Sequence, residues 1–103
     1  MALKTMQGLT PTITVTVGND IDLTEAANVY VSFKQGKKLL KLTDGFDVSA
    51  HQVDIYLEQA DTLSFAPGAV EIQLNWTYSS GQRSATKPVN LSVAPNHLLE
   101  VLP

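Results

Sequence analysis

The stretch NDIDLTEAANVYVSFK, residues 19–34, changes from an acidic turn to an alternating segment within a few positions. Its second half places Val29, Val31 and Phe33 on one face, with more polar residues on the other, as in a β-strand with one buried side. Its first half has an aspartate, Asp22, followed three residues later by a glutamate, as in a capped helical turn. Because one isolated turn is unstable in water, the stretch predicts a corner that crosses between two β-sheets.

The same period-two alternation recurs along the chain and predicts further strands. One-sided alternation is typical of antiparallel sheets that have one packed face. Gly36 and Gly81 predict tight hairpins, and Pro88 in the last strand predicts an edge position or a bulge. We expect strands at residues 12–17, 28–34, 52–58, 69–78 and 89–93, with weaker candidates at 37–43 and 46–49.

A second capped turn lies in EQADTLSF, residues 58–65, where Ala60 and Leu63 are at helical spacing. It predicts another crossover, with Leu23 and Leu63 filling the open ends of a sandwich. The sequence therefore predicts an all-β fold, an immunoglobulin-like antiparallel β-sandwich of about seven short strands with one-turn helical crossovers. A small barrel is the alternative.

The 103 residues are expected to form a single domain. Its core is predicted at residues 12–93, with an N-terminal arm at 1–11 and an apolar C-terminal tail at 94–103. The absence of cysteine excludes disulfides and thiolate sites. A net charge of −3 gives no basic footprint, and no apolar run approaches the ~18 residues of a membrane span. We expect no nucleic-acid or membrane partner, and no secretion by a signal peptide.

No residue pattern specifies a chemistry, so we predict no enzymatic activity, no catalytic residue and no cofactor. His51 and His97 are far apart and lack a partner at a useful spacing. The acidic residues at 19–25 would suit calcium, but a cap and a turn explain them equally, and we predict no metal site. The lysines around Gly36 either bind an anion or protect an exposed edge hairpin from aggregation.

Two kinds of exposed residue are candidate interaction sites. Tyr30, Tyr56 and Tyr78 are expected on the outward faces of their strands. There Tyr30 and Tyr56 either offer a platform to a sugar or a protein or pack under loops or at a sheet edge. The tail has one charged residue, Glu100. Such an apolar terminus either folds back over the open end of its own sandwich or docks on a neighbour, and both alternatives remain open. Its candidate contact residues are Leu98, Leu99, Val101 and Leu102.

The order of these parts also resembles a known family. The features that carry the resemblance are IDLTEA at 21–26, the turn at 59–63, and Pro67-Gly68 before VEIQL. Over residues 12–93 the chain resembles the small β-sandwich domains of phage tail and baseplate proteins, particularly the N-terminal domain of the upper baseplate proteins of phages infecting Gram-positive bacteria. The resemblance implies a non-enzymatic structural protein of a phage or prophage particle.

The resemblance further implies a virion component, assembled in the host bacterial cytoplasm. It would act through association with itself and/or other virion proteins, as a homo-oligomer. The alternative, from a different class, is a small ligand-binding module, for example for carbohydrate, that uses an exposed tyrosine-bearing sheet face.

Overall fold

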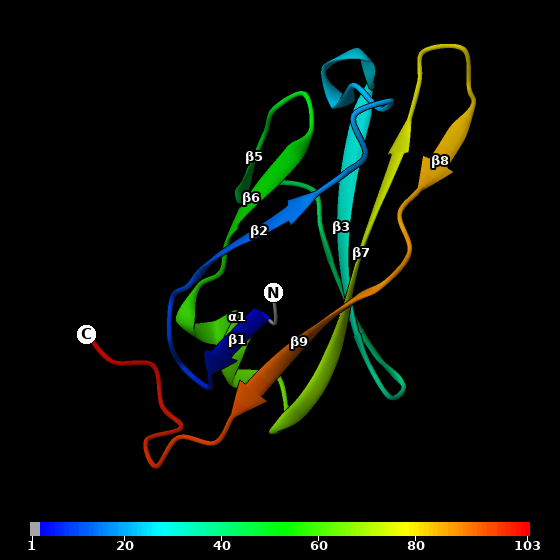
Figure 1. Ribbon diagram of the computed structural model, residues 1–103. Coiled ribbons are helices and arrows are strands. Elements are labelled where there is room, and N and C mark those ends of the chain that lie inside the picture. The colour runs from blue at the N-terminus through cyan, green and yellow to red at the C-terminus, as the bar shows by residue number, and fades with distance from the viewer. Residues whose placement is uncertain (1–2) are drawn as a thin grey trace.

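Two β-sheets packed face to face form the protein in a computed structural model that describes residues 3–103 (Figure 1). The large sheet has the strand order β1-β9-β7-β3-β4, with β8 also paired to β7, and the small sheet has the order β2-β6-β5. This is the predicted all-β sandwich. The strands are β1 (Leu3–Met6), β2 (Thr12–Thr16), β3 (Asn28–Gln35), β4 (Lys38–Leu42), β5 (Phe46–Val48), β6 (Gln52–Tyr56), β7 (Gly68–Thr77), β8 (Arg83–Ala85) and β9 (Val89–Ala94).

Both predicted corners connect the small sheet to the large one. The 3₁₀ turn η1 (Leu23–Glu25) joins β2 to β3, and the short helix α1 (Gln59–Leu63) joins β6 to β7. The strand pairs of the described residues are antiparallel except for β1–β9, which is parallel. This arrangement is the all-β sandwich that the alternating strands predict, but the β1–β9 pair makes the large sheet mixed where a purely antiparallel sheet was expected.

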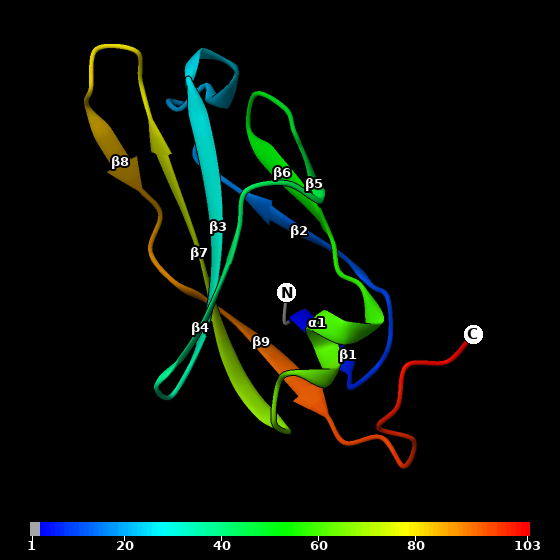
Figure 2. The same ribbon diagram turned by 180° about the vertical axis from the view of Figure 1, so that it is seen from behind.

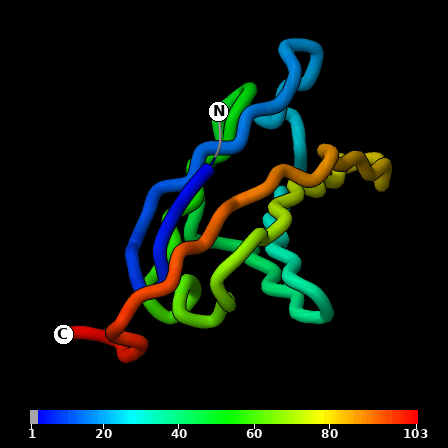
Figure 3. Tube along the Cα trace, turned by 60° about the horizontal axis from the view of Figure 1, so that its bottom comes forward, coloured from blue at the N-terminus to red at the C-terminus, as the bar shows by residue number. Residues whose placement is uncertain are grey.

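The N-terminal arm contains a strand that the alternation did not indicate. In β1, Leu3 lies opposite Leu91 and Met6 lies opposite Ala94, so this short strand extends the large sheet beyond β9. Figure 3 shows the two segments side by side, although they come from opposite ends of the chain. Four residues are too few to show a clear period, and the pairing depends on a partner that is distant in sequence.

The last predicted strand forms as β9, and an additional short strand, β8, precedes it. β8 and β9 both pair with β7, at residues 75–77 and 68–72 respectively. Pro88 lies in the break between them, in agreement with its predicted position at an edge or a bulge. Thr86 bridges the break, because its amide donates to the Leu74 carbonyl (3.0 Å) and its hydroxyl oxygen accepts from the Leu74 amide (3.1 Å).

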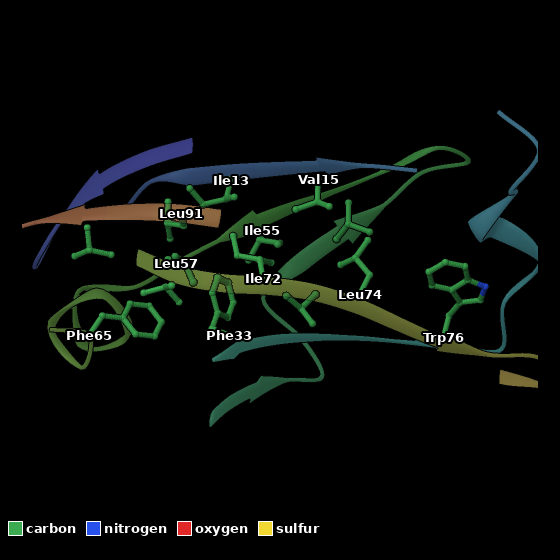
Figure 4. Packing of buried hydrophobic residues seen from close by; sticks show 14 of the residues in the cluster. Ile13, Val15, Phe33, Ile55, Leu57, Phe65, Ile72, Leu74, Trp76 and Leu91 are labelled. Carbon is green, nitrogen blue, oxygen red and sulfur yellow. The ribbon is translucent and has the colours of Figure 1, made fainter. Parts of the chain in front are cut away.

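The hydrophobic core fills the space between the sheets (Figure 4). Trp76 lies at one end of this core, and Phe65 lies at the other, near α1. The Phe65 ring packs against Phe33, with centroids 5.7 Å apart and ring planes at 39°. The buried apolar residues are Ile13, Val15, Leu23, Val31, Phe33, Val53, Ile55, Leu57, Phe65, Val70, Ile72, Leu74, Trp76, Leu91 and Val93.

The corner at η1 forms as the sequence predicts. Asp22 is the N-cap, and its carboxylate accepts a hydrogen bond from the Thr24 amide at 3.0 Å. The cap lets the chain turn without leaving that amide unpaired. Leu23 is buried in the core at this corner, as expected.

The corner at α1 is capped as well, but a different residue fills the interior. Glu58 and Asp61 form a capping box at its start. The prediction that Leu63 closes the sandwich is wrong, because Leu63 is half-buried near Gly8 whereas Thr62 is completely buried. The Thr62 hydroxyl donates to the Leu9 carbonyl at 2.8 Å, so a polar side chain is satisfied there.

Candidate functional site

The C-terminal tail, residues 95–103, leaves β9 without regular secondary structure at the end of the sandwich that carries α1 (Figure 2). Asn96 is its first anchor. The Asn96 amide donates to Gln7 Oε1 at 3.3 Å, and Asn96 Nδ2 donates to the Gln7 carbonyl at 2.9 Å. Since Gln7 is buried directly after β1, these bonds tie the tail to the N-terminal strand.

A second anchor fixes the far end of the tail on α1. The Leu102 amide donates to Gln59 Oε1 at 2.7 Å, and Gln59 Nε2 donates to the Leu102 carbonyl at 3.0 Å. The Gln59 side chain thereby satisfies both backbone groups of Leu102, as a neighbouring strand would. Gln7 and Gln59 were not among the predicted site residues, because an isolated glutamine carries no sequence signal for such a role.

The side chains of the tail remain exposed although its backbone is anchored. The exposed fractions are 54% for Leu98, 61% for Leu99, 61% for Val101 and 45% for Leu102. The tail therefore folds back on its own sandwich through backbone hydrogen bonds, but this contact does not bury the apolar side chains. Clustered exposed apolar residues of this kind mark interaction surfaces.

The two candidate tyrosines do not form one platform. Tyr30 belongs to β3 and points outward from the large sheet, whereas Tyr56 belongs to β6 and points outward from the small sheet. The prediction that Tyr78 points outward is wrong. Tyr78 lies two residues after Trp76, so the two side chains point to the same side, and Tyr78 packs against the core. The Tyr78 hydroxyl oxygen accepts a hydrogen bond from Trp76 Nε1 at 3.0 Å.

Around Tyr30, the outer face of the large sheet has a shallow hollow. The hollow is lined by Tyr30, Ser32, Leu39, Lys41, Gln73, Asn75, Thr77 and Arg83. Lys41 Nζ lies 5.5 Å from the centre of the Tyr30 ring, within cation–π range. Arg83 donates to Asn75 Oδ1 through Nε (3.2 Å) and Nη2 (2.9 Å). Both cations are thus held by neutral partners.

On the small sheet, Tyr56 donates a hydrogen bond from its hydroxyl to Asp47 Oδ2 at 2.8 Å. This bond raises the pKa of Tyr56 above its usual value of 10.0, and burial and the negative charges of Asp47 and Asp54 act in the same direction. The bond exists only while the phenol is protonated. Its contribution to stability is therefore complete below the unfolded pKa near 10 and is lost as the pH rises through the folded pKa.

We expect Asp47→Ala to lower the pKa of Tyr56, because it removes both the acceptor and the nearest negative charge. Absorbance of the ionised phenol, followed as the pH is raised, measures the change, and Tyr56→Phe identifies which step belongs to this residue. A Tyr56 titration that is the same with and without the Asp47 carboxylate would contradict the assignment.

Among the acidic residues around η1, Asp22 is explained by the cap. A hydrogen bond from the Thr24 hydroxyl, together with one from the Thr24 amide, lowers the pKa of Asp22, and His51 adds a smaller favourable charge effect. The His51 ring nitrogen Nδ1 lies 2.7 Å from the Ile21 carbonyl oxygen. Within residues 3–103, no three His, Cys, Asp or Glu side chains group in a way that would hold a metal ion.

Comparisons of the chain with protein-family models, with curated proteins and with solved structures find no match. In the part of the chain that the structure describes, no helix has the length and apolar character to cross a membrane.

Proposed function

We propose that this protein is a non-enzymatic structural component of a phage or prophage particle, of the tail or baseplate type, and that it acts by associating with other protein subunits. The phage assignment rests on the sequence resemblance, and the observation that supports association is the C-terminal tail. Four apolar side chains stand exposed there on a backbone that is fixed at two points. A fixed backbone lowers the entropy cost of binding, so an anchored apolar tail is suited to subunit contact.

A second candidate is a small module that binds carbohydrate on one sheet face. The hollow around Tyr30 supports it, since an aromatic ring beside amide and hydroxyl groups suits a sugar. Only one of the predicted tyrosines lies there, because Tyr56 is on the other sheet. Glycan binding that requires Tyr30 but not Tyr56 would favour this candidate over subunit association.

Removal of the apolar tail is expected to lower the oligomeric mass of the protein in solution. A chain that ends at His97 retains both Asn96 bonds to Gln7 but lacks Leu98, Leu99, Val101 and Leu102. At a salt concentration of about 1 M, which screens ionic contacts, we expect the full chain to form multimers and the shortened chain to be monomeric, as measured by light scattering.

A full-length control separates the apolar side chains from the tail itself. Serine at all four apolar tail positions keeps the chain length and the backbone bonds of Leu102 to Gln59. Since these side chains are exposed, the stability of the domain should change little, while association should be lost as in the shortened chain. Equal multimeric mass for all three proteins would refute the role of the tail.

A further inference from the structure

The charged residues of this protein are separated between its two sheets. The seven lysines and arginines lie on the large sheet or on loops that connect its own strands: Lys4, Lys34, Lys37, Lys38, Lys41, Arg83 and Lys87. The other sheet and the connections that join it to the large one carry Asp20, Asp22, Glu25, Asp44, Asp47, Asp54, Glu58 and Asp61. The remaining acidic residues are Glu71 and Glu100. Lys38 is on the inward side of β4, where it donates to the Ser64 carbonyl, so it is not part of the outer face. On the outer faces themselves, the large sheet carries Lys34, Lys41 and Arg83 with Glu71, and the small sheet carries Asp47 and Asp54, so the two faces differ in sign.

The outer face of the large sheet is positive. The strand register shows which side chains share this face, because Lys41 lies opposite Ser32 and both alternate with the inward residues of β3 and β4. Glu71 is opposite Lys34, so these two charges offset each other. Lys41 and Arg83, on the two sides of the hollow around Tyr30, have no acidic residue opposite them in the sheet.

The outer face of the small sheet is negative, and its charge is concentrated. Asp47 lies directly opposite Asp54 in the β5–β6 pair. Like charges at opposed positions destabilise a sheet. Neutral donors hold the two carboxylates: the Tyr56 hydroxyl binds Asp47, and the Thr14 hydroxyl donates to Asp54 Oδ1 at 2.7 Å. These donors orient the acids but do not neutralise them, so cations from another molecule would relieve the repulsion.

We propose that the large-sheet face of one copy of this chain stacks on the small-sheet face of a second copy, with Lys41 and Arg83 meeting Asp47 and Asp54. The opposite charges of the two faces identify the partner as another copy. Pairing of like faces would bring charges of the same sign together, which opposes association. The remaining contact is head-to-tail, and repetition of such a contact gives a closed ring or an open filament.

This inference rests on the proposed function, since it names the partner and the surface for a protein that works by association. It is nevertheless separable from the role of the tail, because the two contacts respond differently to salt. Ionic contacts weaken as the screening length falls from ~30 Å at 0.01 M salt to ~3 Å at 1 M. Apolar contacts are maintained or strengthened by salts such as sulfate.

Charge reversal on each face provides the test. We expect the multimeric mass of the wild-type chain to increase when the salt concentration is lowered. K41E/R83E and D47K/D54K should each lack this increase, because each variant has two faces of the same sign. An equimolar mixture of the two variants should regain multimeric mass in light scattering, since each then offers the face that the other lacks. A chain with all four reversals should associate by itself.

A matched control keeps the net charge of the large-sheet face. K34E/E71K exchanges the members of the opposed pair, and its association should equal that of the wild type. Circular dichroism checks that each variant is folded. Two results would overturn the proposal: a wild-type chain whose mass does not increase at low salt, or reversal variants whose mass does not increase when they are mixed.

The tail and the stacking contact can fail independently. If the chain that ends at His97 loses association at about 1 M salt while K41E/R83E retains the increase at low salt, the stacking proposal is wrong and the tail carries the proposed function. If K41E/R83E lacks the increase, the mixture regains it and the shortened chain still associates at about 1 M salt, the stacking proposal stands and the role of the tail is wrong.

Discussion

Replacement of Trp76 by alanine is expected to lower the free energy of unfolding by about 3–5 kcal/mol. Trp76 has the largest fully buried side chain, and it closes the end of the core opposite Phe65. Alanine would leave a cavity between the sheets and would also remove the donor to the Tyr78 hydroxyl. A domain of this size has a total stability of about 5–15 kcal/mol, so the expected loss is a large part of it.

Urea denaturation followed by far-ultraviolet circular dichroism measures this effect, because the variant lacks the single tryptophan as a fluorescent probe. Trp76→Phe is the matched control. It fills much of the space but cannot donate to Tyr78, so its loss should be clearly smaller than that of alanine. Equal stability of Trp76→Ala and the wild type would show that this end of the sandwich is not part of the core.

Replacement of Gln7 by leucine is expected to lower the free energy of unfolding by about 1–3 kcal/mol, the cost of leaving a buried polar group without a partner. Gln7 is buried, and its Nε2 donates to the Phe65 carbonyl at 2.8 Å. Its Oε1 accepts from the Asn96 amide. One side chain therefore joins the segment after β1, the connection from α1 to β7, and the start of the tail.

The same substitution at an exposed position provides the control for Gln7. Gln82 lies in the β7–β8 hairpin and is exposed, so Gln82→Leu should change stability by less than about 0.5 kcal/mol. Gln7→Leu should in addition accelerate hydrogen exchange of the Leu98 and Leu102 amides, because the first anchor of the tail is weakened. A Gln7→Leu variant as stable as Gln82→Leu would contradict this account.

The alternation of apolar and polar residues along the chain predicted most of the strands of the sandwich. Where a strand has five or more residues with one apolar face, as in β3 and β7, the period is visible in the sequence and the structure confirms the element. β1 and β8 have four and three residues, too few to define a period. Their existence depends on the free edges that β9 and β7 offer, which are known only after the fold is formed.

The direction of a side chain was predictable where every second residue of a strand was assigned to the same face. Tyr56 alternates with buried neighbours and lies outside, as expected, whereas Tyr78 shares the side of Trp76 and lies inside. Alternation also cannot say which turn residue enters the core at a short helix. The single turn of α1 placed Thr62 inward and left Leu63 half-buried.

Only the apolar composition of the C-terminal tail indicated the candidate site in the sequence. An apolar tail predicts an interaction surface, but its anchors, Gln7 and Gln59, are 89 and 43 residues away from their partners in the tail. No local pattern connects them. In the same way, the lysines near Gly36 stand out in the sequence, while Asp47 and Asp54 become one negative patch only through the register of β5 and β6.

The tail is held almost entirely by its own peptide groups. Leu102 contributes an amide and a carbonyl to Gln59, and Leu98 contributes an amide to Asn96 Oδ1 at 3.2 Å. Apart from Asn96, none of these bonds uses a tail side chain, so residues 98–102 can be exchanged for others without altering the path of the chain. Single substitutions in the tail would therefore change the surface that we propose for subunit contact, while the scaffold that presents it stays the same.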